Sequence, residues 1–531
     1  MAGRSPALIT ADAAAALLRD GDFVIIGGNT GTGVAESVIE AIERRFLSGD
    51  GPRGLTLFHV TGIGAVTEHG LCHLAHEGLV QRVYGGHFGP QLPFMALIDG
   101  NRIEAYNLPQ GVMSGLCRAM AAGQPGVITH IGRGTFMEPE AGGGRMNART
   151  TEPMVERVSL AGRDWLFYRT PGTPRVALLR GTTADEDGYV TMEHEATTRE
   201  DLSIAQAVHN AGGIVICQVK RLAPRGSLHP QMVKIPGFLV DYIVHEPAQM
   251  QTFGTEFDPS RCGETIVALS AIRPDPMSER RVMARRAALE LRRGDVVNLG
   301  VGVSAMIPNV AAEEGITDLI TFTVEAGVIG GVPGHGLDFA TAVNPRAIID
   351  QGYQFDFYDG GGLSAAFLSF AELDAAGNVN VSRFGNRFSG AGGFINITQG
   401  TPRLVFSGTL TGGGLDAAIT DDGLAIRREG EIRKLVPAVD QVSFSGGLAL
   451  ERGQQVTFVT ERAVFELAPE GIVLTEIAPG IRLREDVLDR MGFAPLVSPA
   501  VKTMDARLFR SGPIGLKDHL LAQPHRTRMR I

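Results

Sequence analysis

The stretch Leu17-Leu-Arg-Asp-Gly-Asp-Phe-Val-Ile-Ile-Gly27 has the residue order of a helix end, a tight turn and a buried strand that runs into glycine. The stretch Leu291-Arg-Arg-Gly-Asp-Val-Val-Asn-Leu-Gly300 repeats this order at an offset of 273 residues. Each copy leads into apolar residues at helical spacing, namely Val34, Val38, Ile39 and Ile42 in the first copy and Ala305, Ile307, Val310 and Ala311 in the second. The two strand–helix units predict an α/β fold built by duplication.

A second pair of segments supports the duplication. Ala184-Asp-Glu-Asp-Gly-Tyr-Val190 resembles Leu373-Asp-Ala-Ala-Gly-Asn-Val379, and each follows a strand-like apolar run. Here the offset is 189 residues, so the first half carries roughly 80 more residues between its two markers. Short apolar runs predict buried strands; they include Gly213-Ile-Val-Ile-Cys217, Leu319-Ile-Thr-Phe-Thr-Val324 and Arg403-Leu-Val-Phe406. We therefore expect an α/β fold class with two duplicated, related α/β domains and mainly parallel sheets.

The boundary between the halves is predicted near Ala271-Ile-Arg-Pro-Asp-Pro-Met277. Its two prolines interrupt the pattern before a charged, helix-like run from Glu279 to Arg293. We predict an N-terminal domain over residues 1–272, a linker over 273–279 and a C-terminal domain over 280–515. Residues 516–531 are predicted to be a tail, and its basic end, His525-Arg-Thr-Arg-Met-Arg530, is expected to be frayed and solvated.

The amino-acid composition argues against several classes of protein. Of the 531 residues, 44% are hydrophobic and 20% charged, which is typical of a globular protein. The net charge of −9 argues against a general nucleic-acid binder. The four cysteines form no CxxC pair, which argues against a disulfide scaffold and suits the cytoplasm. No signal peptide or run of about 18 apolar residues indicates a membrane segment. The 69 glycines gather in short clusters after apolar runs, which favours an enzyme with backbone-lined loops.

A single carboxylate, Glu325, is the main candidate for chemistry. It follows the apolar run that ends at Val324 and precedes the glycine-rich stretch Ala326-Gly-Val-Ile-Gly-Gly-Val-Pro-Gly334. A carboxylate beside a buried strand is costly unless it has a purpose, and the glycines can supply backbone N–H donors. A nucleophile, a general base and a ligand for a hydroxyl group all remain open, beside a purely structural helix cap or salt-bridged strand end.

A dinucleotide-binding motif is the competing interpretation of the same residues. Gly300-Val-Gly-Val-Ser-Ala305 is a relaxed G-x-G-x-x-A motif, and Glu325 lies about 20 residues after it, where an acidic ribose ligand is expected. The first half does not reproduce the motif, since Gly31-Thr-Gly-Val-Ala-Glu36 ends in glutamate. A ribose ligand also gives no reason for the glycines after Glu325.

Other groups of polar residues indicate structure rather than chemistry. Cys72-His-Leu-Ala-His-Glu77 offers possible metal ligands, but ligands within one and a half helical turns do not all face one ion, so no metal site is predicted. Glu193-His-Glu195 alternates as a strand does and is expected at the surface.

Longer motifs carry a resemblance that covers nearly the whole chain. They are Tyr106-Asn-Leu-Pro-Gln-Gly111, Gly134-Thr-Phe-Met-Glu-Pro139 with Gly143, Gly144 and Asn147, Thr323-Val-Glu-Ala-Gly-Val-Ile-Gly-Gly-Val-Pro333, Phe355-Asp-Phe-Tyr-Asp-Gly-Gly-Gly362, Gly377-Asn-Val-Asn-Val-Ser382, Gly390-Ala-Gly-Gly-Phe-Ile-Asn-Ile397 and Thr460-Glu-Arg-Ala-Val-Phe-Glu466. With these motifs the chain resembles family I coenzyme A transferases, in their acetate/propionate (short-chain acyl-CoA:carboxylate) branch. Such enzymes consist of two similar α/β domains, in agreement with the duplication.

The resemblance implies a role for particular residues. Glu325 matches the glutamate that forms a glutamyl-CoA thioester in a ping-pong mechanism, and Gly392 or Gly393 matches the glycine whose N–H stabilises the oxyanion. The segment matching the CoA-binding loop comprises Gly300, Val301, Gly302, Val303 and Ser304, and Gln110 and Gly111 are expected to line the acyl pocket. Three residues depart from the family's usual pattern: Ser304 replaces a common proline, Ala340 a glycine, and Ser364 an aspartate.

The resemblance also implies the partners. Coenzyme A is expected as a cosubstrate, with no permanently bound cofactor and no metal. The expected partners are acyl-CoA and small carboxylates, without nucleic acid or membrane, in a cytoplasmic homo-oligomer (dimer or tetramer). An acyl-CoA hydrolase using the same glutamate, and a non-catalytic acyl-CoA or nucleotide-binding module, remain as alternatives.

Overall fold

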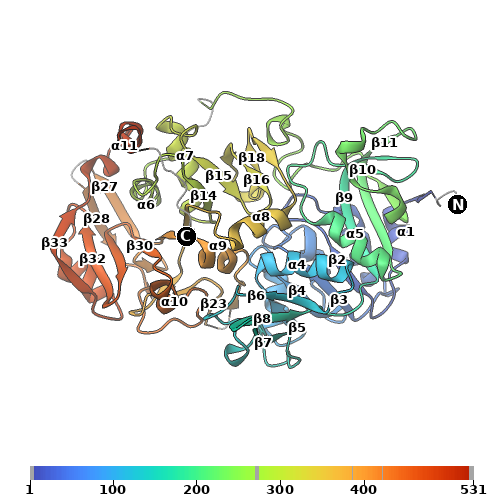
Figure 1. Cartoon of the computed structure of the whole chain (residues 1–531), viewed down its shortest axis with the longest axis horizontal. Helices are drawn as coiled ribbons and strands as arrows, with labels where there is room; N and C mark the ends of the chain where they lie inside the picture. Colours follow the sequence, from blue (N-terminus) through green and yellow to red (C-terminus); the bar gives the residue numbers. More distant parts are fainter. Residues whose placement is uncertain (1–4, 270–273, 386, 421–422, 525–531) are drawn as a thin grey trace.

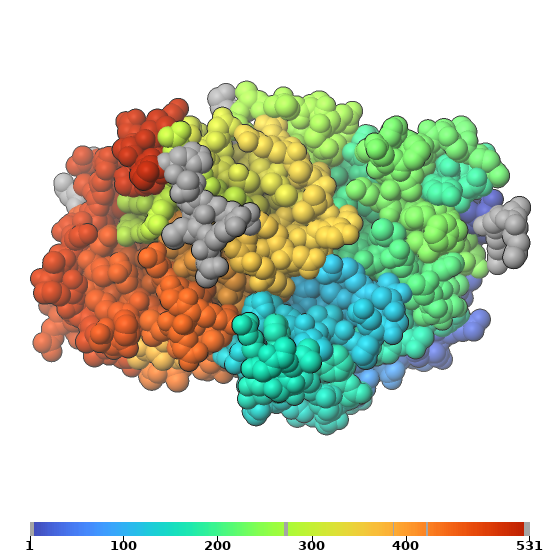
Figure 2. Space-filling model, in the orientation of Figure 1, coloured from blue at the N-terminus to red at the C-terminus, as the bar shows by residue number. Residues whose placement is uncertain are grey.

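Two large sheets lie side by side in the computed structural model, which describes residues 5–269, 274–385, 387–420 and 423–524. The N-terminal half, blue to green in Figure 1, and the C-terminal half, yellow to red, meet in the middle of the molecule. There α4 (Gln110–Ala121) packs against α8 (Gln351–Asp359) and α8 against α9 (Phe394–Gly400). The space-filling view shows the halves in contact along this junction (Figure 2). Among the described residues no helix is both long and apolar enough to cross a membrane.

The first sheet is parallel along its main path. Its strand order is β1 (Ala7–Ile9), β13 (Tyr242–His245), β11 (Ile214–Ala223), β9 (Val176–Asp185), β2 (Phe23–Ile26), β3 (Leu55–His59), β4 (Val80–Gly85) and β5 (Glu104–Asn107). Helices cover both faces of this sheet. Successive side chains of β2 point to opposite faces, and those of each face belong to a separate core cluster that includes helices. Val24 and Ile26 pack with α1 (Ala11–Ala16), α2 (Glu36–Leu47) and α3 (Leu92–Asp99), whereas Phe23 and Ile25 pack with α4 and α5 (Asp201–Asn210).

The second sheet is mixed. Its order is β19 (Ala347–Ile348), β16 (Val328–Ile329), β15 (Thr321–Val324), β14 (Val296–Leu299), β20 (Ala365–Ser369), β25 (Arg403–Ser407), β30 (Gln455–Val459), β31 (Ala463–Ala468), β32 (Gly471–Ile477) and β33 (Leu496–Thr503). The strands from β15 to β30 are parallel, β16 and β31 join antiparallel, and β33 pairs parallel with β32. The expected buried strands are therefore present as β11, β15 and β25.

The strand register confirms the repeat. Val24 of β2 pairs with Val176 of β9, and Val297 of β14 pairs with Ala365 of β20, so the two pairs differ by the offsets of 273 and 189 seen in the sequence. The order β13-β11-β9-β2-β3 in the first sheet corresponds to β30-β25-β20-β14-β15 in the second. Both halves thus contain the same five-stranded parallel unit.

The second marker is the same turn in both halves. Asp185 Oδ1 accepts hydrogen bonds from the N–H groups two and four residues later (3.0 Å each), and Asp374 Oδ1 does the same at the same distances. Gly188 and Gly377 both adopt positive φ, +81° and +75°, which glycine favours. Each turn closes an antiparallel hairpin, β9 with β10 (Val190–Thr191) and β21 (Glu372–Leu373) with β22 (Val379–Asn380).

The longer interval of the first half contains additional elements. Between β3 and β9 the chain adds β4, α3, β5 and α4, followed by a three-stranded antiparallel sheet of β6 (Gly126–Thr129), β8 (Arg163–Arg169) and β7 (Val155–Leu160). This sheet projects at the bottom of Figure 1.

The predicted tail differs from the structure. Residues 516–522 form helix α11 (Leu516–Ala522), and its Leu516 and Leu520 are fully buried in the C-terminal core. Apolar residues four positions apart face the same side of a helix, so this part of the predicted tail packs on the C-terminal core. The basic end, 525–531, lies outside the described residues, as do positions 270–273 at the predicted boundary. Helix α6 (Glu279–Ala288) begins where the charged run was predicted to begin. The domain limits themselves stay a prediction.

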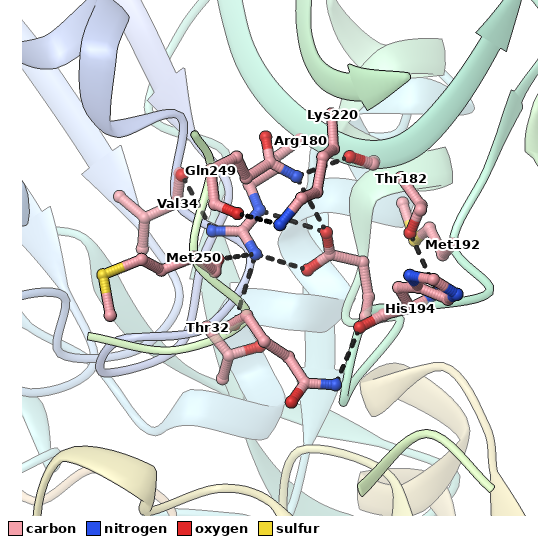
Figure 3. A network of polar contacts seen from close by, with 12 residues as sticks. Thr32, Val34, Arg180, Thr182, Met192, His194, Lys220, Gln249 and Met250 are labelled. Carbon is pink, nitrogen blue, oxygen red and sulfur yellow. Dashed lines mark hydrogen bonds and ion pairs between the residues drawn. The ribbon is translucent and has the colours of Figure 1, made fainter. Parts of the chain in front are cut away.

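The surface position predicted for Glu193-His-Glu195 is wrong for Glu195, whereas Glu193 and His194 are partly exposed. These residues follow β10 in a turn, and Glu195 is only 3% exposed. Its carboxylate is compensated by Arg180, whose Nε donates to Glu195 Oε1 (3.1 Å), and by the Gln249 amide (3.3 Å). Arg180 also donates to the Met250 carbonyl, in the network shown in Figure 3. A buried carboxylate is stable when it is paired in this way.

Candidate active site

A cavity of about 270 Å³ lies where the two halves meet. The first half lines it with Asn29, Thr30, Thr61, Gly62, His87 and Gln110, which follow strands or begin a helix. The second half contributes Glu325, Gly300, Val301, the loop Gly390 to Gly393 and a set of apolar side chains that includes Leu368, Phe370, Val381, Phe394 and Ile397. Ligands of open α/β sheets bind at the carboxyl ends of the strands, and the cavity lies at such ends.

Glu325 is the first residue of a tight turn. Strands β15 and β16 pair antiparallel with Val324 opposite Val328, which leaves Glu325, Ala326 and Gly327 as the connection. Gly327 adopts φ +97° and its N–H donates to the Val324 carbonyl (3.0 Å). The hydrogen-bonded turn therefore fixes where the Glu325 side chain leaves the sheet.

The Glu325 carboxyl is in an apolar environment. Burial raises the pKa of Glu325 to about 7, and the neighbouring Gln110 side chain opposes that rise. Gln110 Nε2 is itself buried, and no described residue accepts a hydrogen bond from it. At neutral pH a large fraction of Glu325 is ionised but poorly solvated, which is the state expected of a carboxylate nucleophile.

Gly393 lies directly against this carboxylate. A Cβ atom at Gly393 would overlap Glu325 Oε2 and press on the ring of Phe355. The backbone of Gly393 has ordinary values, φ −79° and ψ −4°, so the close approach, and not the conformation, requires glycine here.

The first half holds the loop that carries Gly393. Asn107 Oδ1 accepts from the Ala391 N–H (2.9 Å), and the Gln110 N–H donates to the Gly392 carbonyl (3.1 Å). Phe88 N–H donates to the Ser389 carbonyl (2.7 Å). These bonds give the motif from Tyr106 to Gly111 a second role besides lining the cavity. It positions the glycine loop of the other half.

The two candidate oxyanion glycines differ in their hydrogen bonds. Gly392 N–H donates to the Gly86 carbonyl (2.7 Å) and is therefore occupied. Gly393 N–H makes no hydrogen bond to any residue that the structure describes. Of the two, Gly393 has the N–H that is free to bind a ligand.

The predicted CoA loop divides between two environments. Gly300 and Val301 line the cavity with Glu325, and Val301 and Gly302 line an adjoining cavity of about 740 Å³. Val303 and Ser304 are buried and line neither cavity. Ser304 begins the short helix Ser304–Met306, and Val303 is the residue before it. Val303 and Ser304 therefore pack inside the protein, on the side of the loop away from the cavities.

The remaining positions named from the resemblance do not line the cavity. Gly111 does not line the cavity: its N–H donates to Asn396 Oδ1 (3.1 Å), and a side chain there would overlap Asn396 and Phe355. Ala340 has φ +75°, a conformation that favours the glycine usual in the resembling family. Ser364 hydrogen-bonds the β14 backbone, since its Oγ accepts from the Val296 N–H (3.1 Å).

The chain is similar to known proteins along nearly its whole length. A family model described as Coenzyme A transferase matches residues 8–246. The chain is 42% identical over 514 residues to the protein named acetate CoA-transferase YdiF of Escherichia coli (strain K12), which covers 97% of each chain. The chain belongs to the coenzyme A transferase family.

Other members agree with this assignment. The transferase is 44% identical over 509 residues to the caffeate CoA-transferase of Acetobacterium woodii, covering 94% of this chain and 97% of that one. It matches a crystal structure of the acyl-CoA transferase YdiF of Escherichia coli O157:H7, a thioester complex with CoA, with a TM-score of 0.91 and 41% identity over 97% of this chain and 98% of that one. This confirms the predicted α/β fold class and the predicted CoA-transferase activity.

Sequence reasoning missed several residues of this CoA transferase's site. Asn29, Thr30 and Thr61 follow strands of the first half, and His87 lies beside the glycine loop with Nδ1 3.2 Å from the Gly390 carbonyl. Burial lowers the pKa of His87, so its imidazole is neutral at physiological pH. The duplication was the available signal, since equivalent strand ends of both halves approach one cavity.

Proposed function

We propose that the enzyme transfers coenzyme A between a short-chain acyl-CoA and a carboxylate acceptor by a ping-pong mechanism through a glutamyl-CoA thioester on Glu325. The observation that carries the proposal is the position of the Glu325 carboxylate directly against Gly393, whose N–H makes no hydrogen bond to a described residue, in a cavity at the junction of the halves.

The reaction follows from these groups. A Glu325 carboxylate oxygen attacks the acyl carbonyl carbon, the C–S bond breaks, and CoA leaves as a thiolate, which gives a mixed anhydride. The thiolate attacks the glutamyl carbonyl and releases the first carboxylate, which leaves Glu325 joined to CoA as a thioester. An incoming carboxylate reverses both steps. No net proton is consumed, so the neutral His87 is not required as an acid or base.

Each addition creates an oxyanion that needs a donor. Gly393 N–H supplies it, and a donor of this kind contributes roughly 3–4 kcal/mol to the transition state. The bonds from Asn107 and Gln110 hold the loop in advance, so little reorganisation is needed during the reaction.

The adjoining cavity gives the rest of coenzyme A a place to bind. It shares Thr30, His87, Val301 and Phe339 with the acyl cavity, and Arg280 at its edge offers a cation for phosphate. Binding of these remote parts can offset the strain of the first acyl transfer.

The lining of the acyl cavity indicates the substrate class. Among its described lining residues there is no lysine or arginine, and the one histidine is neutral. A second carboxylate on the substrate would therefore lie in an apolar cavity without a cation, which is costly. Monocarboxylates with small apolar tails fit this lining.

The test is mass spectrometry of the intact protein and its peptides after incubation with propionyl-CoA, without acceptor, under a mild acid quench. We expect an adduct of the mass of CoA on the peptide that contains Glu325, and its loss on addition of acetate. Glu325→Ala should abolish both adduct and transfer; Glu193→Ala, a change at a carboxylate outside the cavity, should retain them.

The outcome separates the alternatives. Steady release of CoA without acetate and without adduct would identify a hydrolase instead. Wild-type transfer by folded Glu325→Ala protein would exclude Glu325 as the nucleophile. Binding of propionyl-CoA with neither adduct nor turnover would indicate a binding module.

A further inference from the structure

A cluster of histidines and carboxylates lies in the N-terminal half, outside the acyl cavity. Glu36 at the start of α2, His69 and His73 bring one ligand atom each within 4.8 Å of one another. Glu36 Oε1 lies 3.0 Å from His69 Nδ1 and 3.5 Å from His73 Nε2. Two ligands on a tetrahedral zinc ion at roughly 2.0–2.1 Å are about 3.3 Å apart, so two of the three spacings already match.

A second carboxylate orients one of these histidines. Glu43, two turns along α2, places one oxygen 2.6 Å from His73 Nδ1 and the other 2.7 Å from His76 Nε2. Histidine ligands of metal ions usually donate their other ring N–H to a carboxylate in this way. His73 thus presents Nε2 toward Glu36 in a fixed direction.

The cluster is accessible from solvent. The side chains of Glu36, His69 and His73 are 20%, 42% and 24% exposed, so an ion can reach them from solvent.

We propose that Glu36, His69 and His73 bind a divalent transition-metal ion of the zinc class, with water in the fourth position and with Glu43 positioning His73. Three N and O ligands in a tetrahedral arrangement with one open position suit Zn²⁺, and Co²⁺ as its spectroscopic substitute. The ligands come from two segments of the chain, since Glu36 is on α2 and His69 and His73 lie about 30 residues later, which is why the sequence run from Cys72 to Glu77 alone did not indicate a site.

The ion would brace one wall of the larger cavity. His69 directly follows the loop Gly64 to Glu68, in which Gly64, Ala65 and Val66 line that cavity. The Gly70 N–H donates to Glu36 (2.9 Å), and His69 stacks on Phe253 with ring centroids 4.6 Å apart. A metal bond would add a strong link between this loop and α2. It has no part in the transfer chemistry at Glu325.

The test uses the full chain without a polyhistidine tag. The protein is treated with a chelator, dialysed and titrated with Co²⁺, and the visible absorption of four-coordinate Co²⁺ is followed; displacement by Zn²⁺ then gives its affinity. We expect one saturable site per chain, and a higher Tm in the presence of Zn²⁺.

Variants locate the ion. His69→Ala and His73→Ala should weaken Zn²⁺ binding at least 100-fold and lose the Tm increase, and Glu43→Gln should weaken it about 10–100-fold, the range known for such outer partners. The control His245→Ala, an exposed histidine on β13, should bind as the wild type does.

Two results would overturn the proposal. One is the absence of saturable Co²⁺ or Zn²⁺ binding to the wild-type protein, which would leave the cluster as a hydrogen-bonded link between α2 and the loop. The other is binding of unchanged affinity in both His69→Ala and His73→Ala, which would place the ion elsewhere.

Discussion

Gly392 and Gly393 are adjacent, and the structure predicts opposite consequences for the same substitution at each. Gly393→Ala places a methyl group on Glu325 Oε2, while the backbone, at φ −79°, accepts alanine without strain. In Gly392→Ala the new Cβ atom makes only ordinary contacts, of which the nearest is to Gln110 Oε1 at 3.6 Å. The alanine would, however, have to adopt φ +58°, in the left-handed region.

The magnitudes separate the two variants. Alanine at position 393 keeps its backbone N–H, but its methyl group displaces the Glu325 carboxylate from that donor. Loss of an oxyanion donor's contribution costs about 10²–10³ in kcat, so we expect Gly393→Ala to lose at least that much. The Glu325 side chain can turn away from the new methyl group, so stability should change little. For Gly392→Ala the left-handed conformation costs about 1–2 kcal/mol, or a fall in Tm of about 2–8 °C, while kcat stays within about 10-fold.

The assay is the initial rate of transfer from propionyl-CoA to acetate, together with thermal melting of both variants. Glu325→Ala supplies the inactive reference. A Gly393→Ala enzyme with normal kcat, or a Gly392→Ala enzyme that loses 100-fold at unchanged Tm, would refute the assignment of the oxyanion donor to Gly393.

Four further results are expected. Because the proposed nucleophile, Glu325, can attack only when it is ionised and its pKa is raised to about 7, kcat/KM should rise with pH through about 7, as measured in a pH profile. The folded protein holds that proton more tightly than the unfolded chain, so this group's contribution to stability is lost as pH rises from about 4.5 to 7; Glu325→Gln should therefore be more stable than wild type at pH 8, by at most about 3 kcal/mol, in denaturant titrations. Succinate should be at least about 100-fold poorer than propionate as an acceptor in kcat/KM, since the cavity lacks a cation; equal rates would contradict the described lining. Asp185→Ala and Asp374→Ala should each cost about 1–3 kcal/mol of unfolding free energy, because each leaves two backbone N–H groups of the same turn without their acceptor.

Local patterns predicted the scaffold well. The strands β2 and β14 were placed from apolar runs that end in glycine, and the register pairs Val24–Val176 and Val297–Ala365 reproduce both sequence offsets. Such runs are readable because burial on both faces of a parallel strand leaves no polar alternation. Glu325 was visible for the same reason, as a charge at the end of an apolar run.

Long-range contacts set the limit of prediction. The sequence left Gly392 and Gly393 equivalent, and only the bond from Gly392 N–H to Gly86, more than 300 residues away in sequence, distinguishes them. Glu195 was expected at the surface because Arg180, which makes its burial possible, lies 15 residues earlier, on β9. Polar residues acquire roles from partners that no local spacing encodes.

The duplication also explains why the proposed nucleophile occurs once. Phe23 of β2 pairs with Thr56, and the equivalent Val296 of β14 pairs with Thr321. Thr56 and Thr321 are therefore equivalent positions in the two halves. Four residues after them lie Val60 in the first half and Glu325 in the second. Val60 is buried in the apolar core of the first half, and the next two residues, Thr61 and Gly62, line the cavity. A second carboxylate at that junction would repel the first and raise the pKa of Glu325 further, so less of the nucleophile would be ionised at neutral pH. The equivalent strand ends therefore serve different purposes, one carrying the reactive group and the other the wall that encloses it.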